Sequence, residues 1–362
     1  MHAMQAIHQL LPGLRAGDAI SSHALAIQQF LRGWGVASEL YSQFESEEPA
    51  MHGLCHPFGE YSSQPNQALI YHHGIGSVLA DFAARLPDPV ILYYHNITPP
   101  EYMQVVHPRL ARGLAWGREQ LSLFAKRPYA LAGSEYNRRE LIAAGFRQVE
   151  VLSYFVQFDV LDSSPATAAG QAVIQRYGDG RTNWLFVGRT VPNKCQIDLV
   201  RMFAYYVHCI DPTARLLLVG SSVDTPGYRG EVERMVSLLQ VGNIELCGAV
   251  PQAALGAYYQ VSTGYISMSE HEGFGVPLLE AMHMGVPVVA YAASAVPDTL
   301  GPAGVLFHRK RFEVVAELLG LVASNAGLRQ RLVAVQRQRV AEFAPARIAT
   351  QLRACLERAG LL

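Results

Sequence analysis

Short apolar segments alternate along this chain with longer amphipathic segments. The apolar segments of the first half predict strands near 4–10, 36–41, 68–72, 90–94, 129–132 and 149–152. Those of the second half predict strands near 183–187, 215–219, 243–246, 263–266, 287–290 and 303–306. Short buried strands that alternate with helices are typical of an α/β protein whose parallel sheets are covered by helices.

The amphipathic segments predict the helices and suggest a division into domains. We expect helices near 19–33, 134–144, 195–208, 228–240, 252–259, 277–284, 311–340 and 344–358. The stretch Asp159–Thr182 is rich in Ser, Ala, Gly and Asp, and we interpret it as an interdomain linker. A chain of 362 residues is long enough for two domains, which we place at 1–160 and 161–343, followed by a final helix in 344–362.

Composition narrows the functional classes. A formal net charge of -1 argues against a nucleic-acid-binding protein. The five cysteines are scattered without a CxxC motif, which favours a reducing compartment over disulfides or zinc. The sequence contains no signal-peptide pattern, and no apolar run approaches the roughly 18 residues of a membrane span. We expect a cytoplasmic protein and leave open a peripheral contact with the inner face of the membrane.

The most informative motif lies after the predicted strand at 263–266. Glu272 and Glu280 are separated by seven residues, with Gly-Phe-Gly and then Pro277 between them. Proline suits the first turn of a helix, and the glycines allow the backbone to approach a ligand. Strand, glycine-bearing loop and helix would place both carboxylates near one crevice, where their oxygens can accept hydrogen bonds from hydroxyl groups.

The complete EGFG-PLLEAM frame, followed by Gly-Val-Pro-Val-Val-Ala at 285–290, resembles the retaining glycosyltransferases of family 4. The resemblance implies the GT-B fold: two facing Rossmann-like domains with parallel sheets, and a C-terminal helix that crosses back to the first domain. It is strong over 183–306 and looser over 11–150.

The resemblance also implies roles in binding a nucleoside-diphosphate sugar. Glu280 would bind the ribose hydroxyls and Glu272 the hydroxyls of the donor sugar. Backbone N–H groups near Phe274 and Gly275 would contact the sugar or its phosphate. His271 would touch the sugar or serve as a loop histidine, and Val250 would line the base pocket.

Gly188, Arg189 and Lys194 follow the first strand of the second half, where the family binds the nucleotide diphosphate. Two cations placed there would stabilise the negative charge that builds on the leaving diphosphate. The chain has no DxD motif. We therefore expect no metal and no cofactor, and we assign catalytic roles to His95, Arg189, Lys194 and Glu272.

In the first half, Gly17 matches the family's glycine-rich loop, which approaches the donor diphosphate. His95 follows the strand at 90–94 and would bind the donor sugar or orient the acceptor hydroxyl; the alternative is a buried structural histidine. His72 and His73 end a neighbouring strand, and one of the two is expected to line the acceptor side. A metal site formed by His72, His73 and His95 lacks an accompanying carboxylate motif.

Two further features concern the acceptor side. Ser134 and Arg138 match a Ser-x-x-x-Arg/Lys stretch of the family and are candidates for acceptor binding. The segment Pro108–Pro128 contains five basic residues and one acidic residue among apolar positions. It predicts either a Rossmann helix with a solvated face or a basic helix lying on an anionic membrane.

The sequence thus predicts a retaining hexosyltransferase that uses a nucleoside-diphosphate sugar and a hydroxyl of a cell-surface glycan or lipid-linked acceptor. The tight frame resembles mannosyl- and rhamnosyl-type members, which favours a GDP-linked donor. The alternatives are a GT-B sugar-nucleotide epimerase, which would need no acceptor, and an inactive GT-B subunit that binds a partner.

Overall fold

The computed structural model of the protein describes residues 4–44, 46 and 49–362. It divides into two compact units. The first comprises Met1–Gln104, Pro108–Val156 and Phe343–Leu362, and the second comprises Val105–His107 and Gln157–Glu342. Apart from the short segment Val105–His107, the chain passes from one unit to the other after residues 156 and 342. The sequence predicted these boundaries at residues 160 and 343.

The first unit is built on a seven-stranded parallel sheet with the strand order β3-β2-β1-β4-β5-β6-β7. Its strands are β1 (Ala6–Gly13), β2 (Leu40–Phe44), β3 (His56–Pro57), β4 (Gln67–His73), β5 (Val90–Tyr94), β6 (Ala130–Ala132) and β7 (Val149–Val151). Both β4 and β5 are buried along their whole length, as strands covered on both faces must be.

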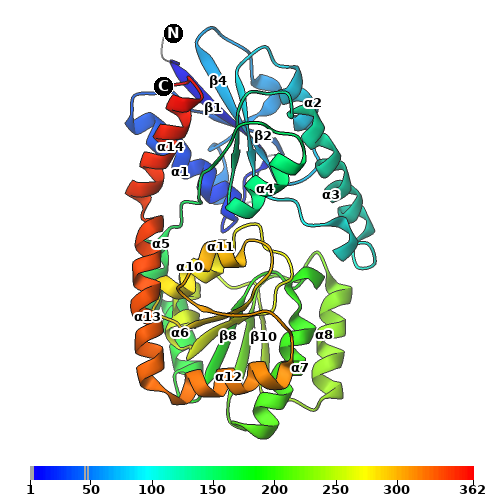
Figure 1. The fold of residues 1–362 in the computed structure, drawn as a ribbon, viewed down its shortest axis with the longest axis vertical. Helices are drawn as coiled ribbons and strands as arrows, with labels where there is room; N and C mark the ends of the chain where they lie inside the picture. Colours follow the sequence, from blue (N-terminus) through cyan, green and yellow to red (C-terminus); the bar gives the residue numbers. More distant parts are fainter. Residues whose placement is uncertain (1–3, 45, 47–48) are drawn as a thin grey trace. The chain divides into compact units, whose positions relative to one another are not determined.

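The helices of the first unit are α1 (Ala19–Gly33), α2 (Val78–Arg85), α3 (Pro108–Gln120), α4 (Glu135–Ala143) and α14 (Pro345–Arg358). The side chain of Asp18 caps α1 by accepting a hydrogen bond from the backbone of Ser21. The last helix, α14, lies beside α1 (Figure 1), and the guanidinium of Arg353 lies 5.5 Å from the ring centroid of Trp34. The expected return of the final helix to the first unit is confirmed.

The second unit is built on a six-stranded parallel sheet with the order β10-β9-β8-β11-β12-β13. Its strands are β8 (Asn183–Val187), β9 (Arg215–Val219), β10 (Ile244–Gly248), β11 (Gly264–Ser267), β12 (Val288–Tyr291) and β13 (Val305–Phe307). The chain builds the sheet outward from β8 in one direction and then continues from β11 in the other. The predicted α/β fold with parallel sheets is confirmed.

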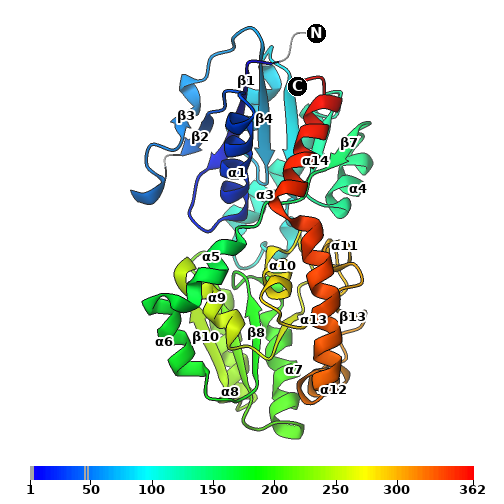
Figure 2. The same cartoon turned by 90° about the vertical axis from the view of Figure 1, so that its left-hand side faces the viewer.

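Helices cover both faces of this second sheet, and Figure 2 shows α7 and α9 on opposite sides of it. The helices are α5 (Phe158–Ser163), α6 (Ala168–Tyr177), α7 (Gln196–Cys209), α8 (Pro226–Leu238), α9 (Gln252–Gln260), α10 (Val276–His283), α11 (Val296–Leu300), α12 (Phe312–Ser324) and α13 (Ala326–Val340).

The interpretation of Asp159–Thr182 as a linker is wrong. Most of this stretch forms α5 and α6, which pack against α9 within the second unit. Its small residues serve close helix contacts rather than flexibility. A Cβ on Gly170 would lie 2.0 Å from the carbonyl oxygen of Ser164, and a Cβ on Gly256 would lie 2.0 Å from that of Leu161.

Two other expectations need correction. The single helix expected over 311–340 is broken at Asn325, whose side chain accepts a hydrogen bond from the backbone of Leu328 and caps α13. Asparagine at this position is a strong start signal for a helix. The short edge strand β3, which contains an exposed Pro57, has no counterpart among the predicted strands because two residues carry no periodicity.

The contact between α5 and α9 leads to a stability prediction. Gly256→Ala should destabilise the protein by about 1–3 kcal/mol, because the added methyl group meets backbone rather than a mobile side chain. Gly230→Ala, in α8, is the matched control. A Cβ there meets only Arg234 Nη1 at 3.7 Å, so the better helix propensity of alanine should leave stability equal or raised. Urea unfolding of both variants measures the difference; equal midpoints would contradict the account.

Candidate functional site

The topology of the second unit identifies where a ligand should bind. In open parallel sheets, ligands bind beyond the carboxyl ends of the strands, at the point where the strand order reverses. That point lies between the neighbouring strands β8 and β11. The loop after β8 carries Arg189 and Lys194, and the loop after β11 carries Glu272. The sequence singled out the same residues from the motif and from their places after predicted strands.

The structure brings Lys194 and Glu272 together. Lys194 Nζ lies 2.6 Å from Glu272 Oε2, and the two side chains are only 18% and 14% exposed. Lys194 ends a short 3-10 helix, Pro192–Lys194, immediately before α7. A largely buried cation and carboxylate in direct contact form one polar centre, with a group for anions next to a group for hydroxyls.

The backbone around Glu272 is held in place by a neighbouring loop. The backbone N–H of Glu272 donates to the hydroxyl of Ser294 at 2.7 Å, and its carbonyl accepts from the backbone of Ala295. Gly275 follows with φ +90 at the N-cap of α10, and a Cβ there would lie 2.8 Å from Leu278 Cδ1. Only glycine adopts this turn without strain.

Glu280 lies in α10 and is 8% exposed. The hydroxyl of Tyr259 donates a hydrogen bond to Glu280 Oε2 at 2.7 Å. Burial raises the pKa of Glu280 to about 7, although the hydrogen bond from Tyr259 opposes this shift. The carboxyl group is therefore close to its titration point at neutral pH.

Other donor-side candidates lie near the ends of these strands. Arg189 directly follows Gly188, and its exposed side chain makes no hydrogen bond or ion pair with the residues that the structure describes. The carbonyl of His271 accepts from Asn193 Nδ2 at 3.1 Å, and that of buried Phe274 accepts from Thr299 Oγ1. Val250 lies in the loop after β10.

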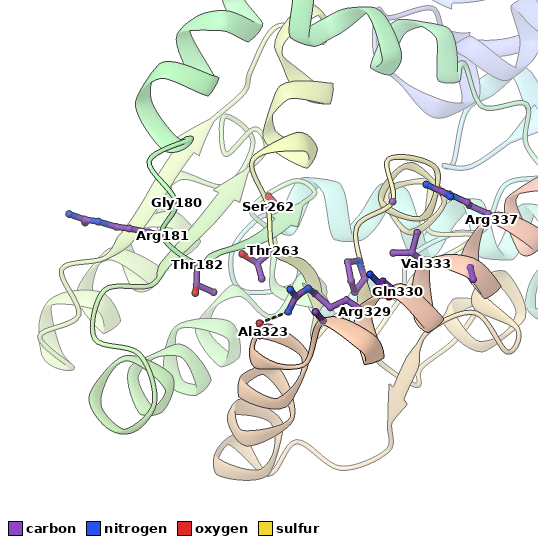
Figure 3. A pocket seen from close by; sticks show the side chains of 14 residues that line it. Gly180, Arg181, Thr182, Ser262, Thr263, Ala323, Arg329, Gln330, Val333 and Arg337 are labelled. Carbon is purple, nitrogen blue, oxygen red and sulfur yellow. Dashed lines mark hydrogen bonds between the residues drawn. The ribbon is translucent and has the colours of Figure 1, made fainter.

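One pocket of the second unit, of about 730 Å³, lies away from this centre. Its lining includes Thr182, Thr263 and Pro287, which precede β8, β11 and β12, so it lies at the amino ends of the strands. Figure 3 shows Arg329 turned toward Ala323, with Arg181 directed away from the other labelled side chains. None of the candidate donor-side or acceptor-side residues lines this pocket.

In the first unit, His95 follows β5 and is 6% exposed. Both of its ring nitrogens have partners within the unit. Nε2 lies 2.7 Å from His72 Nδ1, and Nδ1 lies 2.6 Å from the hydroxyl of Tyr154. Its ring stacks on Tyr93 with centroids 4.3 Å apart.

The positions of the protons along this series of hydrogen bonds can be assigned by starting from Gln9, where the series ends. Gln9 Nε2 donates to the carbonyl of Ala24, so Gln9 Oε1 is left to accept from His72 Nε2. Burial lowers the pKa of His72 to about 3 and the pKa of His95 well below its usual value. Both rings are therefore neutral, His95 donates to His72, and Tyr154 donates to His95. Any contact of His95 with a substrate through a ring nitrogen would replace one of these bonds.

Each of the remaining first-unit candidates has its own surroundings, away from the hydrogen bond between His72 and His95. His73 lies on the opposite face of β4, where its Nε2 is 2.8 Å from the carbonyl of Gly117. Ser134 is the N-cap of α4, and Arg138 is paired with Glu135 at 2.7 Å. Gly17 lies in an exposed turn with φ +71, which glycine accommodates readily.

The structure adds residues that the sequence did not single out. Ser294 and Lys310 lie three positions after β12 and β13, so the strand-end rule applied to every strand would have found them. Tyr259, Tyr154 and Gln9 had no local signal, because their contacts come from elements distant in sequence.

Residues 175–339, slightly under half of the chain, match the family model described as "Glycosyl transferases group 1". The match falls within the second unit and includes Arg189, Lys194, Glu272 and Glu280.

The curated relatives to which the chain is similar include mannosyltransferases. The chain is 32% identical over 154 residues to the O-antigen chain mannosyltransferase B of Escherichia coli, covering 41% of this chain and 38% of that protein. It is 28% identical to the GDP-mannose-dependent alpha-mannosyltransferase of Mycobacterium tuberculosis, covering 71% of this chain and 63% of that protein. The matched part thus spans less than two thirds of these relatives.

Solved structures share the fold along the whole chain. Anabaena HepE in complex with UDP and glucose superposes with a TM-score of 0.76 at 15% identity, over 98% of this chain and 100% of that one. WaaG, a glycosyltransferase involved in lipopolysaccharide biosynthesis, superposes with a TM-score of 0.71 at 12% identity, over 97% of this chain and 98% of that one. The solved structures show the GT-B fold for this chain, and the family model and the relatives to which it is similar are those of glycosyltransferases.

Within the described part of the chain, no helix is both long and apolar enough to cross a membrane.

The burial of Glu280 leads to a pH prediction. Because its pKa is raised from 4.5 to about 7, the neutral carboxyl contributes stability that is fully present below pH 4.5 and is lost as pH rises through 7. The loss should be about 3 kcal/mol. Urea unfolding from pH 4.5 to 8 should show this decline in the wild type and a flatter profile in Glu280→Gln, which keeps an acceptor for Tyr259. Parallel profiles would contradict the assignment.

Proposed function

We propose that this protein is a retaining hexosyltransferase of family 4 that moves a hexose from a nucleoside-diphosphate sugar to an acceptor hydroxyl. The observation that carries the proposal is the contact between Lys194 and Glu272 at the switch point of the second sheet. A cation for the diphosphate and a carboxylate for the sugar hydroxyls lie side by side, as a donor with those two parts requires.

The charges support departure of a diphosphate. In the unliganded protein, Lys194 is neutralised by Glu272. An incoming diphosphate would draw Lys194 toward its oxygens and leave Glu272 to accept hydrogen bonds from the sugar. Exposed Arg189, two residues after β8, would add a second cation. As the sugar–phosphate bond breaks, these two side chains would stabilise the growing negative charge, so that no metal ion is needed.

For the nucleoside, the proposal assigns the ribose hydroxyls to Glu280. Its pKa of about 7 means that hydroxyl donors would favour the ionised carboxylate and release a proton on binding near neutral pH. For the reaction, we propose front-side attack with retention, in which the leaving phosphate takes the proton of the acceptor hydroxyl. No carboxylate among the candidate residues is assigned as a covalent nucleophile.

The donor sugar and acceptor are proposed from the relatives. Mannosyltransferases occur among them, one of them named as GDP-mannose-dependent, which favours a GDP-linked hexose such as mannose. A glycan or lipid-linked hydroxyl is the proposed acceptor. His72, His73, Ser134 and Arg138 are the acceptor-side candidates. His95 is proposed as the catalytic residue that binds the donor sugar or orients the acceptor hydroxyl, in exchange for one of its internal hydrogen bonds. A cytoplasmic location with peripheral membrane contact accompanies this proposal.

Separate variants of the two glutamates test the proposal. Glu280→Gln should weaken binding of the free nucleoside diphosphate by about 1.5–3 kcal/mol, because a charged acceptor is lost. Glu272→Gln should bind that diphosphate as well as the wild type or better, since Lys194 loses its internal partner, and yet lose sugar transfer. Calorimetry with GDP, UDP and ADP, together with turnover of the corresponding sugars, measures both. The opposite pattern would reverse the proposed orientation of the donor.

A further inference from the structure

A second charged cluster lies at the same edge of the second sheet. Lys310, in the loop after β13, donates from Nζ to Asp198 Oδ2 at 2.8 Å and to Glu270 Oε1 at 2.7 Å. Its side chain is only 14% exposed, and its ammonium lies 5.0 Å from the ring centroid of Tyr291. One largely buried cation thus joins the loops after β11 and β13 to the first turn of α7.

The two carboxylates of this cluster lie next to the residues of the proposed donor site. Asp198, in the first turn of α7, is four residues after Lys194, and Glu270 is two residues before Glu272. Backbone contacts connect the same loops, because the N–H of Glu270 donates to the carbonyl of Asn193 at 2.9 Å. Lys310 therefore ties the loop of Lys194 to the loop of Glu272 at a distance of a few residues from each.

The backbone at this junction needs such support. Cys195, directly after Lys194, has φ +54 and ψ +42, a left-handed conformation that costs a residue with a Cβ roughly 1–2 kcal/mol. Strained residues of this kind persist where surrounding contacts fix them. The bond from Lys310 to Asp198 fixes the first turn of the helix that Cys195 caps.

The ammonium of Lys310 takes the place that a metal ion could occupy. Among the described residues, ligand atoms of Cys195, Asp198 and Glu270 lie within 4.8 Å of one another. Lys310 already bonds two of these three groups. Burial disfavours its charge, but the hydrogen bonds to Asp198 and Glu270 outweigh this and raise the pKa of Lys310. Burial also raises the pKa of Cys195 to about 11, so the third group is a neutral thiol.

We propose that Lys310 is a positioning residue for the donor site: its double ion pair to Asp198 and Glu270 holds in place the two segments that carry Lys194 and Glu272. This inference rests on the proposed function, because it assigns a consequence to the geometry of that same site. Lys310 would act on the donor site indirectly, because its ammonium is already bonded to Asp198 and Glu270.

Lys310→Met removes the cation and keeps an unbranched side chain. The expected result is about a tenfold weaker affinity for nucleoside diphosphate and about a tenfold lower kcat, because a displaced charged group loses most of its benefit. Lys310→Arg can still bridge two carboxylates and should return both values to within about threefold of the wild type. Calorimetry with GDP, UDP and ADP gives the affinities.

A double-mutant cycle separates positioning from general stability. If Lys310 acts through Lys194, adding Lys310→Met to Lys194→Met should change the diphosphate affinity by less than about twofold. The same tenfold loss in both backgrounds, or an unchanged affinity in Lys310→Met alone, overturns the inference. Asp198→Asn, which removes one of the two partners, provides the same comparison if Lys310→Met does not fold.

Arg215→Met is the matched control. Arg215 is 12% exposed and pairs with Asp179, but it begins β9 and lies at the opposite edge of the sheet. This variant should lower the melting temperature without changing diphosphate affinity.

A wild type that binds diphosphate but transfers no sugar refutes the proposed function, and the affinities of the variants still decide the role of Lys310. A wild type that binds none of these three diphosphates, and not dTDP either, refutes both.

Discussion

The parallel direction of all six strands in the second sheet is the constraint on which the donor site depends. It places every loop that follows a strand at one edge, so residues far apart in the sequence become neighbours there. Lys194 after β8 meets Glu272 after β11, Ser294 after β12 holds the backbone of Glu272, and Lys310 after β13 bonds the loops of both charged residues. No single loop could form this centre alone.

Much of the fold follows from the sequence because buried parallel strands are continuous apolar runs. β5 and β8 coincide with their predicted ranges, and the helix predicted at 19–33 is α1 (Ala19–Gly33), which Asp18 caps. The failure over Asp159–Thr182 has a clear physical cause. Asp159–Thr182 has the composition of a linker, but Gly170 and Gly256 mark where helices approach within van der Waals contact of backbone. Composition alone does not distinguish small residues that permit flexibility from small residues that permit close packing.

The candidate site was predictable in part. Arg189, Lys194, Glu272 and Glu280 are found from the motif and from their places at strand ends. The sequence does not show which partner each of these groups contacts. Tyr259 donates a hydrogen bond to Glu280, and Glu272 pairs with Lys194. Gln9, His72 and His95 form a hydrogen-bonded series. These contacts depend on side-chain direction in the folded unit. They show that both ring nitrogens of His95 are hydrogen-bonded within the first unit, and its catalytic role stays a prediction.

The central claim is that the contact between Lys194 and Glu272 marks the site of a nucleoside-diphosphate sugar. It is tested most directly by calorimetric titration of the wild type and of Lys194→Ala with GDP-, UDP-, dTDP- and ADP-linked hexoses. The account predicts saturable binding of at least one donor to the wild type. That affinity should fall by about 30-fold or more in Lys194→Ala, as expected for a charged contact of roughly 2–3 kcal/mol. Equal affinities in the two proteins, or no binding of any donor to the wild type, would contradict it.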